Sequence, residues 1–230
     1  MTTDIRPFPV DDAVLSRIRP MQFRDAEAMA RLHHAAMGDS LWARLGERFL
    51  AVLYRVLIDT PGFLAFVYEE DGRVRGFIAG STDTARMMRT ALRRGWFLIA
   101  PAALPGALRS PSTALRLVDT PRYTAASSAV SLPPGLTAES LFCSFEPDLR
   151  GKRVSGHINK VLFDELRARG HQHVKITTDA GNAAAVRQLE SWGFAEAGSF
   201  AFYGKPMRTF VLDLAASPRV EARSRHPMVE

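Results

Sequence analysis

The sequence predicts an α+β domain in which helices flank a mixed, mostly antiparallel sheet. Three observations predict this class. Residues 138–170 have, in order, the patterns of a buried strand, a basic turn and a helix. Two strand-like runs flank Asp71-Gly72, a dipeptide typical of tight hairpins. Several other segments repeat apolar residues at helical spacing. The 230 residues are 47% hydrophobic and 23% charged, which suits one globular domain, and we expect it to span residues 1–216.

The first third of the chain predicts a strand, two helices and a hairpin. Both helices follow from apolar residues that recur on one face, and Pro61-Gly62 ends the second of them. His33 and His34 lie on the first helix and are candidates for substrate contacts. The predicted elements are an edge strand from Ile18, helices over residues 25–37 and 41–57, and hairpin strands Phe63–Tyr68 and Val74–Ile78.

Residues 81–137 form an insert that holds most of the excess charge. It carries seven arginines and two acidic residues, a balance of +5 in a chain whose net charge is +6. Thr84–Arg94 predicts a helix, and the apolar run Trp96–Ile99 follows it, before Pro101 and Pro105. Beyond these prolines, residues 114–118 predict a second short helix and residues 127–135 a loop.

The central segment combines a strand with a basic turn. Glu139–Phe145 is a short apolar and aromatic run, and Pro147 ends it because proline cannot donate to a sheet. Apolar residues then recur at helical spacing over residues 154–166. The start of this helix presents free N–H groups and the positive end of its dipole, and residues 150–153 add three cations and a glycine. The segment therefore predicts a site for phosphate or diphosphate.

The basic turn resembles the acyl-CoA-binding motif of the GNAT superfamily of N-acyltransferases. The match runs from Phe145 to Ser155 and includes Pro147, Arg150 and Gly151 at the motif's positions. Arg153 replaces the usual second glycine, and Ser155 replaces the usual small residue.

A second block resembles another motif of the same superfamily. Val174–Thr178 predicts a strand, and a helix over Asn182–Trp192 follows it. Leu189 stands where the family usually has a tyrosine. The residues that match the motif are Asn182, Ala185, Gly193 and Phe194.

The resemblance implies a sheet splayed between its fourth and fifth strands, with an acyl-CoA, above all acetyl-CoA, as co-substrate in the gap. It implies no metal, and no His, Cys or carboxylate cluster has the spacing of metal ligands. The residues that the resemblance places around the co-substrate are Cys143, Ser144, Phe145, Arg150, Gly151, Lys152, Arg153, Val154, Ser155, Asn182 and Ala185.

The implied reaction is direct transfer of the acyl group to a primary amine of a small molecule, such as an amino sugar or another anionic acceptor. The amine must lose a proton, and Glu139 at the start of the central strand is the candidate general base, with Glu146 as its rival. Tyr203 is the candidate acid for the departing thiolate, because Leu189 cannot donate a proton.

Two other functions stay open at this point. The chain could be a long-chain N-acyltransferase fed by an acyl carrier protein, with an apolar tunnel walled by Met87, Met88, Phe97 and Leu98. It could also be a binding module that has lost catalysis, since Arg153 and Leu189 depart from the family pattern.

The insert has four candidate roles. It could cover the site of an anionic acceptor, dock an acidic acyl carrier protein, or lie on an anionic membrane surface with Trp96, Phe97 and Leu98 inserted. It could instead pack on the sheet or form a homodimer. Its charge alone does not indicate nucleic-acid binding, because no binding motif accompanies it.

The rest of the chain adds little chemistry. One cysteine, Cys143, allows no disulfide within the chain, and the start lacks the apolar core of a signal peptide, so we expect a cytoplasmic protein. Ala197–Tyr203 and Thr209–Leu214 predict the last two strands, and residues 217–230 predict a disordered tail.

Overall fold

The computed structural model describes residues 5–38, 40–109, 132–202 and 204–221. These residues form a seven-stranded sheet with the order β1-β2-β3-β4-β5-β7-β6, in which β4–β5 is the parallel pair and every other neighbouring pair is antiparallel. The strands are β1 (Ile18–Pro20), β2 (Phe63–Glu70), β3 (Arg73–Ser81), β4 (Glu139–Phe145), β5 (His173–Asp179), β6 (Ala195–Phe202) and β7 (Lys205–Asp213).

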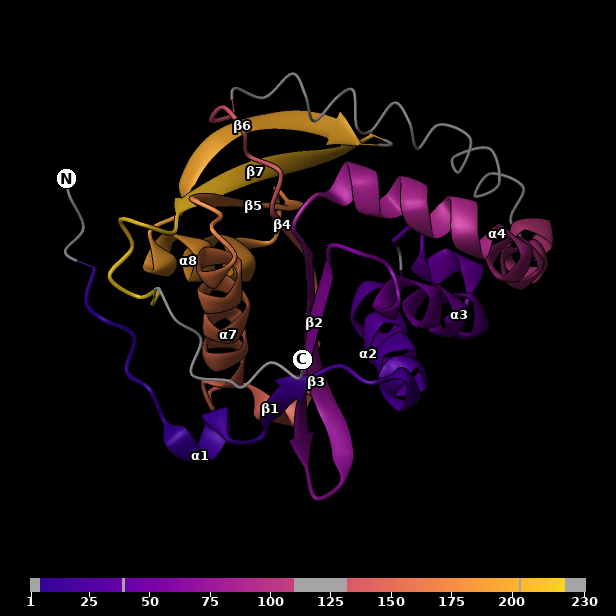
Figure 1. The fold of residues 1–230 in the computed structure, drawn as a ribbon, viewed down its shortest axis with the longest axis horizontal. Coiled ribbons are helices and arrows are strands. Elements are labelled where there is room, and N and C mark those ends of the chain that lie inside the picture. Colours follow the sequence, from indigo (N-terminus) through magenta and orange to yellow (C-terminus); the bar gives the residue numbers. More distant parts are fainter. Residues whose placement is uncertain (1–4, 39, 110–131, 203, 222–230) are drawn as a thin grey trace.

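Helices cover both faces of the sheet, as Figure 1 shows. One face carries α2 (Ala26–Met37), α3 (Glu47–Ile58) and α4 (Thr84–Arg109), and the other carries α7 (Val154–Ala168) and α8 (Ala183–Trp192). Each face has its own hydrophobic core. The short elements are α1 (Asp12–Leu15) and the 3₁₀ turns η1 (Phe23–Asp25), η2 (Ala43–Leu45) and η3 (Pro147–Leu149).

This arrangement confirms the predicted fold class, including the splayed sheet. Strands β4 and β5 pair only at Glu139–Lys175 and Ser140–Ile176, although both continue beyond these residues. The edge of β4 over residues 141–145 therefore pairs with β3 on one side and has no strand partner on the β5 side. The two strands therefore diverge toward their carboxyl ends, and we call this divergence the β4–β5 cleft.

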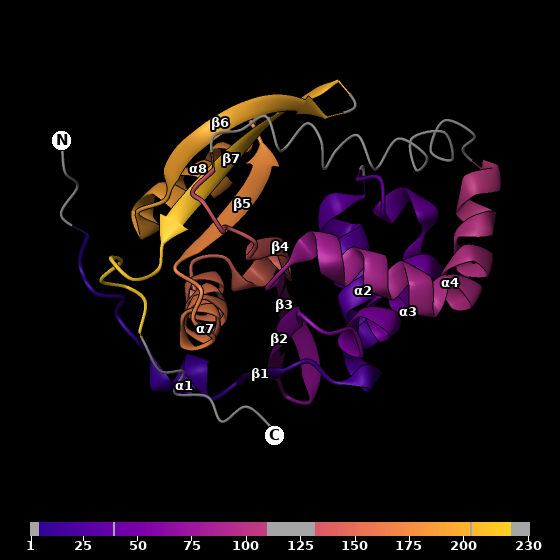
Figure 2. The same ribbon diagram turned by 45° about the horizontal axis from the view of Figure 1, so that its top comes forward.

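The insert differs from its prediction, because α4 continues past Arg94 to Arg109 with Pro101 and Pro105 inside it. Both prolines are exposed, so water can reach the carbonyl groups that they deprive of a partner, and the helix bends there instead of ending (Figure 2). The predicted short helix over residues 114–118 lies outside the described residues.

Helix α4 packs closely on α3 and η2 through two glycines. An added Cβ at Gly95 would lie 2.5 Å from the Val56 side chain, and one at Gly106 would lie 2.5 Å from the backbone of Leu45. The inner face of α4 also buries Met87 completely. The insert is therefore a packing helix over at least this part of its length.

The segment after β7, where we expected a tail, packs on α7 as far as Glu221. Val220 is buried in the core beneath α7, and the Lys160 ammonium donates to the carbonyl of Arg219 at 3.1 Å. The backbone N–H of Glu221 donates to Asp164 at 2.8 Å. Residues 222–230 lie outside the described part of the chain.

Candidate active site

The predicted anion site lies where β4 ends and α7 begins. After η3 the chain reaches Gly151, whose φ is +80°, and then Arg153, whose φ is +58°. Arg153 is the N-cap residue of α7, and its side chain makes no capping hydrogen bond. The first N–H groups of α7 therefore have no side-chain cap, and they lie just after the carboxyl end of β4.

Three cations surround this turn, as the sequence predicts. Arg150, Lys152 and Arg153 are all exposed. Lys152 lies 4.0 Å from the Asp148 carboxylate, whereas Arg150 and Arg153 make no ion pair with any residue that the structure describes. Two unpaired guanidinium groups beside free N–H groups suit a diphosphate, which offers several acceptor oxygens.

Arg153 adopts the left-handed conformation that the family's second glycine would take without strain. The backbone carbonyl of Arg153 is held by His157, whose Nδ1 lies 2.9 Å away, while Nε2 of the same ring accepts the N–H of Asp11 at 2.8 Å. His157 is fully buried. A buried imidazole with both nitrogens occupied thus fixes the turn, and the sequence pattern did not reveal this role.

A cluster of charges also holds the strand that leads into the turn. Arg75 on β3 bonds to Glu70, Glu146 and Asp148, and its hydrogen bond to Asp148 lowers the pKa of that carboxyl group. Glu146 is bound by Arg73 as well, at 2.9 Å. Two arginines thus hold the two carboxylate oxygens of Glu146, one each.

Glu139 lies at the closed end of the cleft, where β4 and β5 still pair. Its carboxylate is 8% exposed and lies 3.5 Å from the ammonium group of Lys175. The backbone partner of Glu139 across the parallel pair is the same Lys175. Sequence reasoning missed Lys175, because only the parallel register brings the two residues together.

Side chains of the central strand are used for packing and leave its backbone open to the cleft. Ser144 donates to the carbonyl of Leu32 on α2 at 2.8 Å. Cys143 packs against the core that contains α7. Burial raises the pKa of its thiol to about 12, which makes it a poor nucleophile. Any contact of Cys143 and Ser144 with a pantetheine arm would therefore come from their backbone groups.

The second motif lies on α8. The Asn182 side chain accepts the N–H of Ala185 at 3.1 Å and so caps this helix. Leu189 is buried in the core beside Trp192, so it lines no site. The predicted acid, Tyr203, lies outside the described residues.

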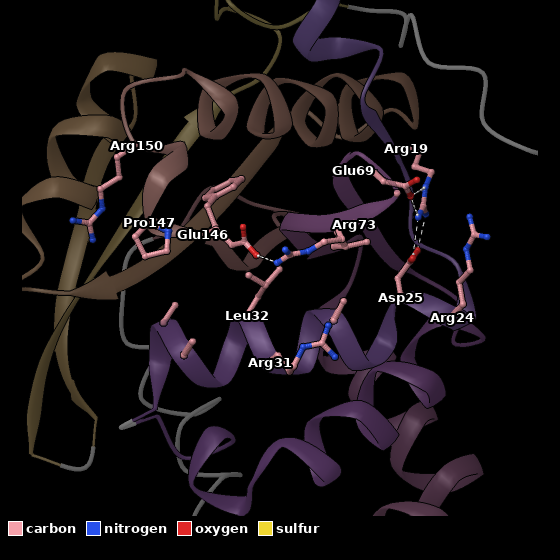
Figure 3. A pocket seen from close by; sticks show the side chains of 16 residues that line it. Arg19, Arg24, Asp25, Arg31, Leu32, Glu69, Arg73, Glu146, Pro147 and Arg150 are labelled. Atoms are coloured by element: carbon pink, nitrogen blue, oxygen red, sulfur yellow. Dashed lines mark hydrogen bonds and ion pairs between the residues drawn. The ribbon is translucent and has the colours of Figure 1, made fainter.

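A basic cavity of about 880 Å³ adjoins the turn on the side of α2. Its lining includes Arg24 of η1, Arg31 of α2, Arg73 of β3 and Arg150 of the turn (Figure 3). Its carboxylates are largely neutralised, since Asp25 and Glu69 bond to Arg19 and Glu146 bonds to Arg73. Arg31 makes no ion pair with a residue of the described ranges, so the cavity favours an anionic ligand.

The two histidines of α2 do not contact this cavity. His33 is fully buried, with Nδ1 2.7 Å from the hydroxyl of Tyr54 and its ring packed on Phe142. Burial lowers the pKa of His33 to about 4. His34 lies 3.7 Å from the carboxylate of Glu47. His33 is therefore a core residue that supports β4.

Comparison with known proteins supports the same fold. Ribosomal-protein-alanine N-acetyltransferase from Brucella melitensis is 17% identical and superimposes with a TM-score of 0.55 over 86% of this chain and 99% of its own. Ribosomal-protein-S18-alanine N-acetyltransferase from Escherichia coli is 16% identical, with a TM-score of 0.53 over 85% and 92%. A GNAT-family acetyltransferase from Bacillus cereus is 10% identical, with a TM-score of 0.52 over 85% and 95%.

At the sequence level, the chain is similar to mycothiol acetyltransferase from Brachybacterium faecium. The two are 35% identical over 68 residues, which are 28% of this chain and 20% of that protein. No family model matches the sequence. The chain thus has the fold of these N-acetyltransferases, which confirms the fold that the resemblance implies.

Proposed function

We propose that the protein is an acyl-CoA-dependent N-acyltransferase. The observation that carries the proposal is the edge of β4 that has no strand partner, which runs from the candidate base to the basic turn. Glu139 lies where the cleft closes, and the uncapped start of α7 with Arg150 and Arg153 lies where it opens. A pantetheine arm laid along residues 141–145 would join the two ends as an added strand does.

The proposed donor is acetyl-CoA. Its diphosphate would bind at residues 150–153, where free N–H groups and cations meet. The adjoining cavity has room and charge for the phosphorylated nucleotide half of CoA, which an acyl carrier protein lacks.

The proposed chemistry needs a base and a polarised thioester. Glu139 would accept the proton of the amine, directly or through one water molecule. Backbone N–H groups of β4 on the open side would polarise the thioester oxygen. The acceptor we propose is a primary amine of a small molecule, with amino sugars and other anionic amines first.

The alternative of a long-chain N-acyltransferase rested on an apolar tunnel walled by Met87, Met88, Phe97 and Leu98. Met87 is buried against the core, whereas Phe97 and Leu98 are 57% and 49% exposed, so these side chains do not enclose a common tunnel. The inactive binding module stays as the second candidate, because Arg153 and Leu189 depart from the motifs. Turnover with any amine decides against it.

Two measurements test the proposal. Thermal melting with acetyl-CoA and with dephospho-CoA, which lacks the 3′-phosphate, measures binding. At a hundred times its dissociation constant a ligand adds about 2.7 kcal/mol of stability. A thiol-release screen of several acyl-CoAs against amino sugars, amino acids, polyamines and peptides then identifies the substrates. Absence of any shift at millimolar acetyl-CoA would contradict the proposal.

The role of Glu139 has its own test with a matched control. Glu139→Gln should lower kcat by about 10²- to 10⁴-fold with little change in acetyl-CoA binding, because it removes the base. Glu146→Gln removes a carboxylate of the same strand region and should mainly raise KM for acetyl-CoA, because it loosens the turn. Equal effects of the two variants on kcat would refute the assignment.

A further inference from the structure

The outer face of α4 carries most of the exposed apolar surface of the described chain. Seven large hydrophobic side chains are exposed among the described residues; six of them belong to α4, and the seventh is Phe23. The most exposed are Leu108 at 72% and Trp96 at 66%. The other four are Leu92, Phe97, Leu98 and Leu104. Such a concentration on one helix marks a contact surface.

These side chains are not needed to hold α4 on the domain. The helix already buries an inner face made of Met87, Ala91, Gly95, Ile99, Ala102 and Gly106. Two glycines of that face bring the helix into close contact with α3 and η2. The helix is thus apolar on both sides, and only the inner side has a partner among the residues that the structure describes.

Charge separates the helix into two parts. Arg86, Arg89, Arg93 and Arg94 lie in its first half, and Arg109 lies at its end. All five are exposed, no acidic residue occurs between Thr84 and Arg109, and none of the five pairs with a carboxylate of the described ranges. Most of the exposed apolar side chains follow the four arginines, from Trp96 onward.

We propose that the outer face of α4 docks on the surface of an anionic lipid bilayer. Trp96, Phe97 and the leucines that follow would enter the boundary between headgroups and acyl chains, and the arginines of the first half would bind lipid phosphates. The helix would lie on the bilayer, because no helix in the described ranges is long and apolar enough to span it.

Charge complementarity favours lipid over a second copy of this chain. A two-fold contact through this face would bring two sets of arginines together with no acidic residue of α4 to neutralise them. Anionic headgroups supply the missing negative charge, and acyl chains cover the apolar side chains. The proposal does not depend on the proposed enzymatic activity.

The position of the helix suits docking. The distal part of α4 lies at one end of the molecule, whereas α7 and α8 lie on the other side of β2 and β3 (Figures 1 and 2). A bilayer against this end leaves the turn at residues 150–153 on the part of the molecule that faces away from α4.

Flotation of the full chain with vesicles tests the proposal. Binding to phosphatidylcholine vesicles that contain phosphatidylglycerol should exceed binding to pure phosphatidylcholine on the order of a hundredfold, and it should weaken in high salt. The double variant Trp96→Ala/Phe97→Ala should bind about tenfold more weakly. Phe23→Ala, which removes the exposed hydrophobic residue outside α4, is the control and should bind like the native protein.

The arginines have a matched pair of variants. Arg89→Glu/Arg93→Glu should abolish the preference for anionic vesicles, whereas Arg187→Glu, at an exposed position on α8, should keep it. All of these positions are exposed, so melting temperatures should stay close to that of the native protein. Vesicle binding that is equal in both arginine variants would overturn the proposal.

Tryptophan fluorescence gives a readout that needs no disruptive change. Trp192 is 2% exposed and Trp42 is half-buried, so Trp96 is the tryptophan that a bilayer can newly cover. Anionic vesicles should shift the emission to the blue in the native protein but not in Trp96→Phe. A shift that persists in Trp96→Phe overturns the placement. If the native protein forms dimers but binds no vesicles, and the Trp96→Ala/Phe97→Ala variant is a monomer, the partner is a second copy of the chain and the lipid proposal is wrong.

Discussion

Replacing Arg153 by glycine should stabilise the folded protein and should lower its affinity for acetyl-CoA. Arg153 has a φ of +58°, a conformation that costs a side-chain-bearing residue about 1–2 kcal/mol. Glycine removes this strain, although the freer unfolded chain takes back about 0.5–1 kcal/mol. The net gain is about 0.5–1 kcal/mol. For a domain of this size, that amounts to about 1–4 °C in Tm.

The matched control is Lys152→Gly, one residue earlier. Lys152 is exposed like Arg153 and carries the same charge, but its φ is negative, so glycine relieves no strain there. Lys152→Gly should therefore lower the Tm, by about 2 °C. Because each variant removes one exposed cation from the turn, both should weaken acetyl-CoA binding by a similar factor, about fivefold.

Thermal melting of the free proteins, followed by titration with acetyl-CoA, separates the two effects. Arg153→Gly should raise the Tm and Lys152→Gly should lower it, whereas both variants should bind acetyl-CoA more weakly than the native protein. A lower Tm for Arg153→Gly than for the native protein would refute the strain argument, because the carbonyl that His157 binds is kept in the variant.

Three further predictions concern packing and pH. Gly76→Ala should cost about 1–3 kcal/mol and weaken acetyl-CoA binding, because a Cβ there would overlap the Phe145 ring, and chemical denaturation measures it. Gly106→Ala should cost about 2 kcal/mol despite its better helix propensity, because the new methyl group would meet the backbone of Leu45; an unchanged denaturation midpoint would contradict this contact. His33 has a folded pKa of about 4, below its ordinary 6.5, so the unfolded chain takes up the proton first and stability falls as the pH drops from 6.5 toward 4. The loss should reach about 3 kcal/mol and should be missing in His33→Leu, and unfolding curves at several pH values test whether the two proteins respond to acid alike.

Local pattern was enough to predict the sheet and most helices, because periodicity and turn residues act over short stretches. The hairpin at Asp71-Gly72 and the strand Glu139–Phe145 form as expected. Helix α4 is longer than the predicted Thr84–Arg94, because it continues through Gly95 and through two exposed prolines, Pro101 and Pro105, which bend it without ending it.

The site was predictable only where its residues are neighbours in the chain. The cations and the glycine of residues 150–153 lie in one turn and were found from the sequence. The clamp of Arg75 on Glu146 joins residues 71 positions apart, and the pairing of Lys175 with Glu139 depends on strand register. Neither leaves a local signal, so the sequence alone left Glu146 as a rival base.

Helix α7 is held from outside by both ends of the described chain. On one side Phe8 stacks on Trp192 and packs against Gly156, where any Cβ would meet the ring. On the other side Val220 lies in the core beneath the helix. Residues 219–221 bond to Lys160, Asp164 and Arg167, so α7 reaches its full set of contacts only when nearly the whole described chain has been synthesised. A polypeptide that ends at Ala216 would keep every motif residue but lose these contacts to α7.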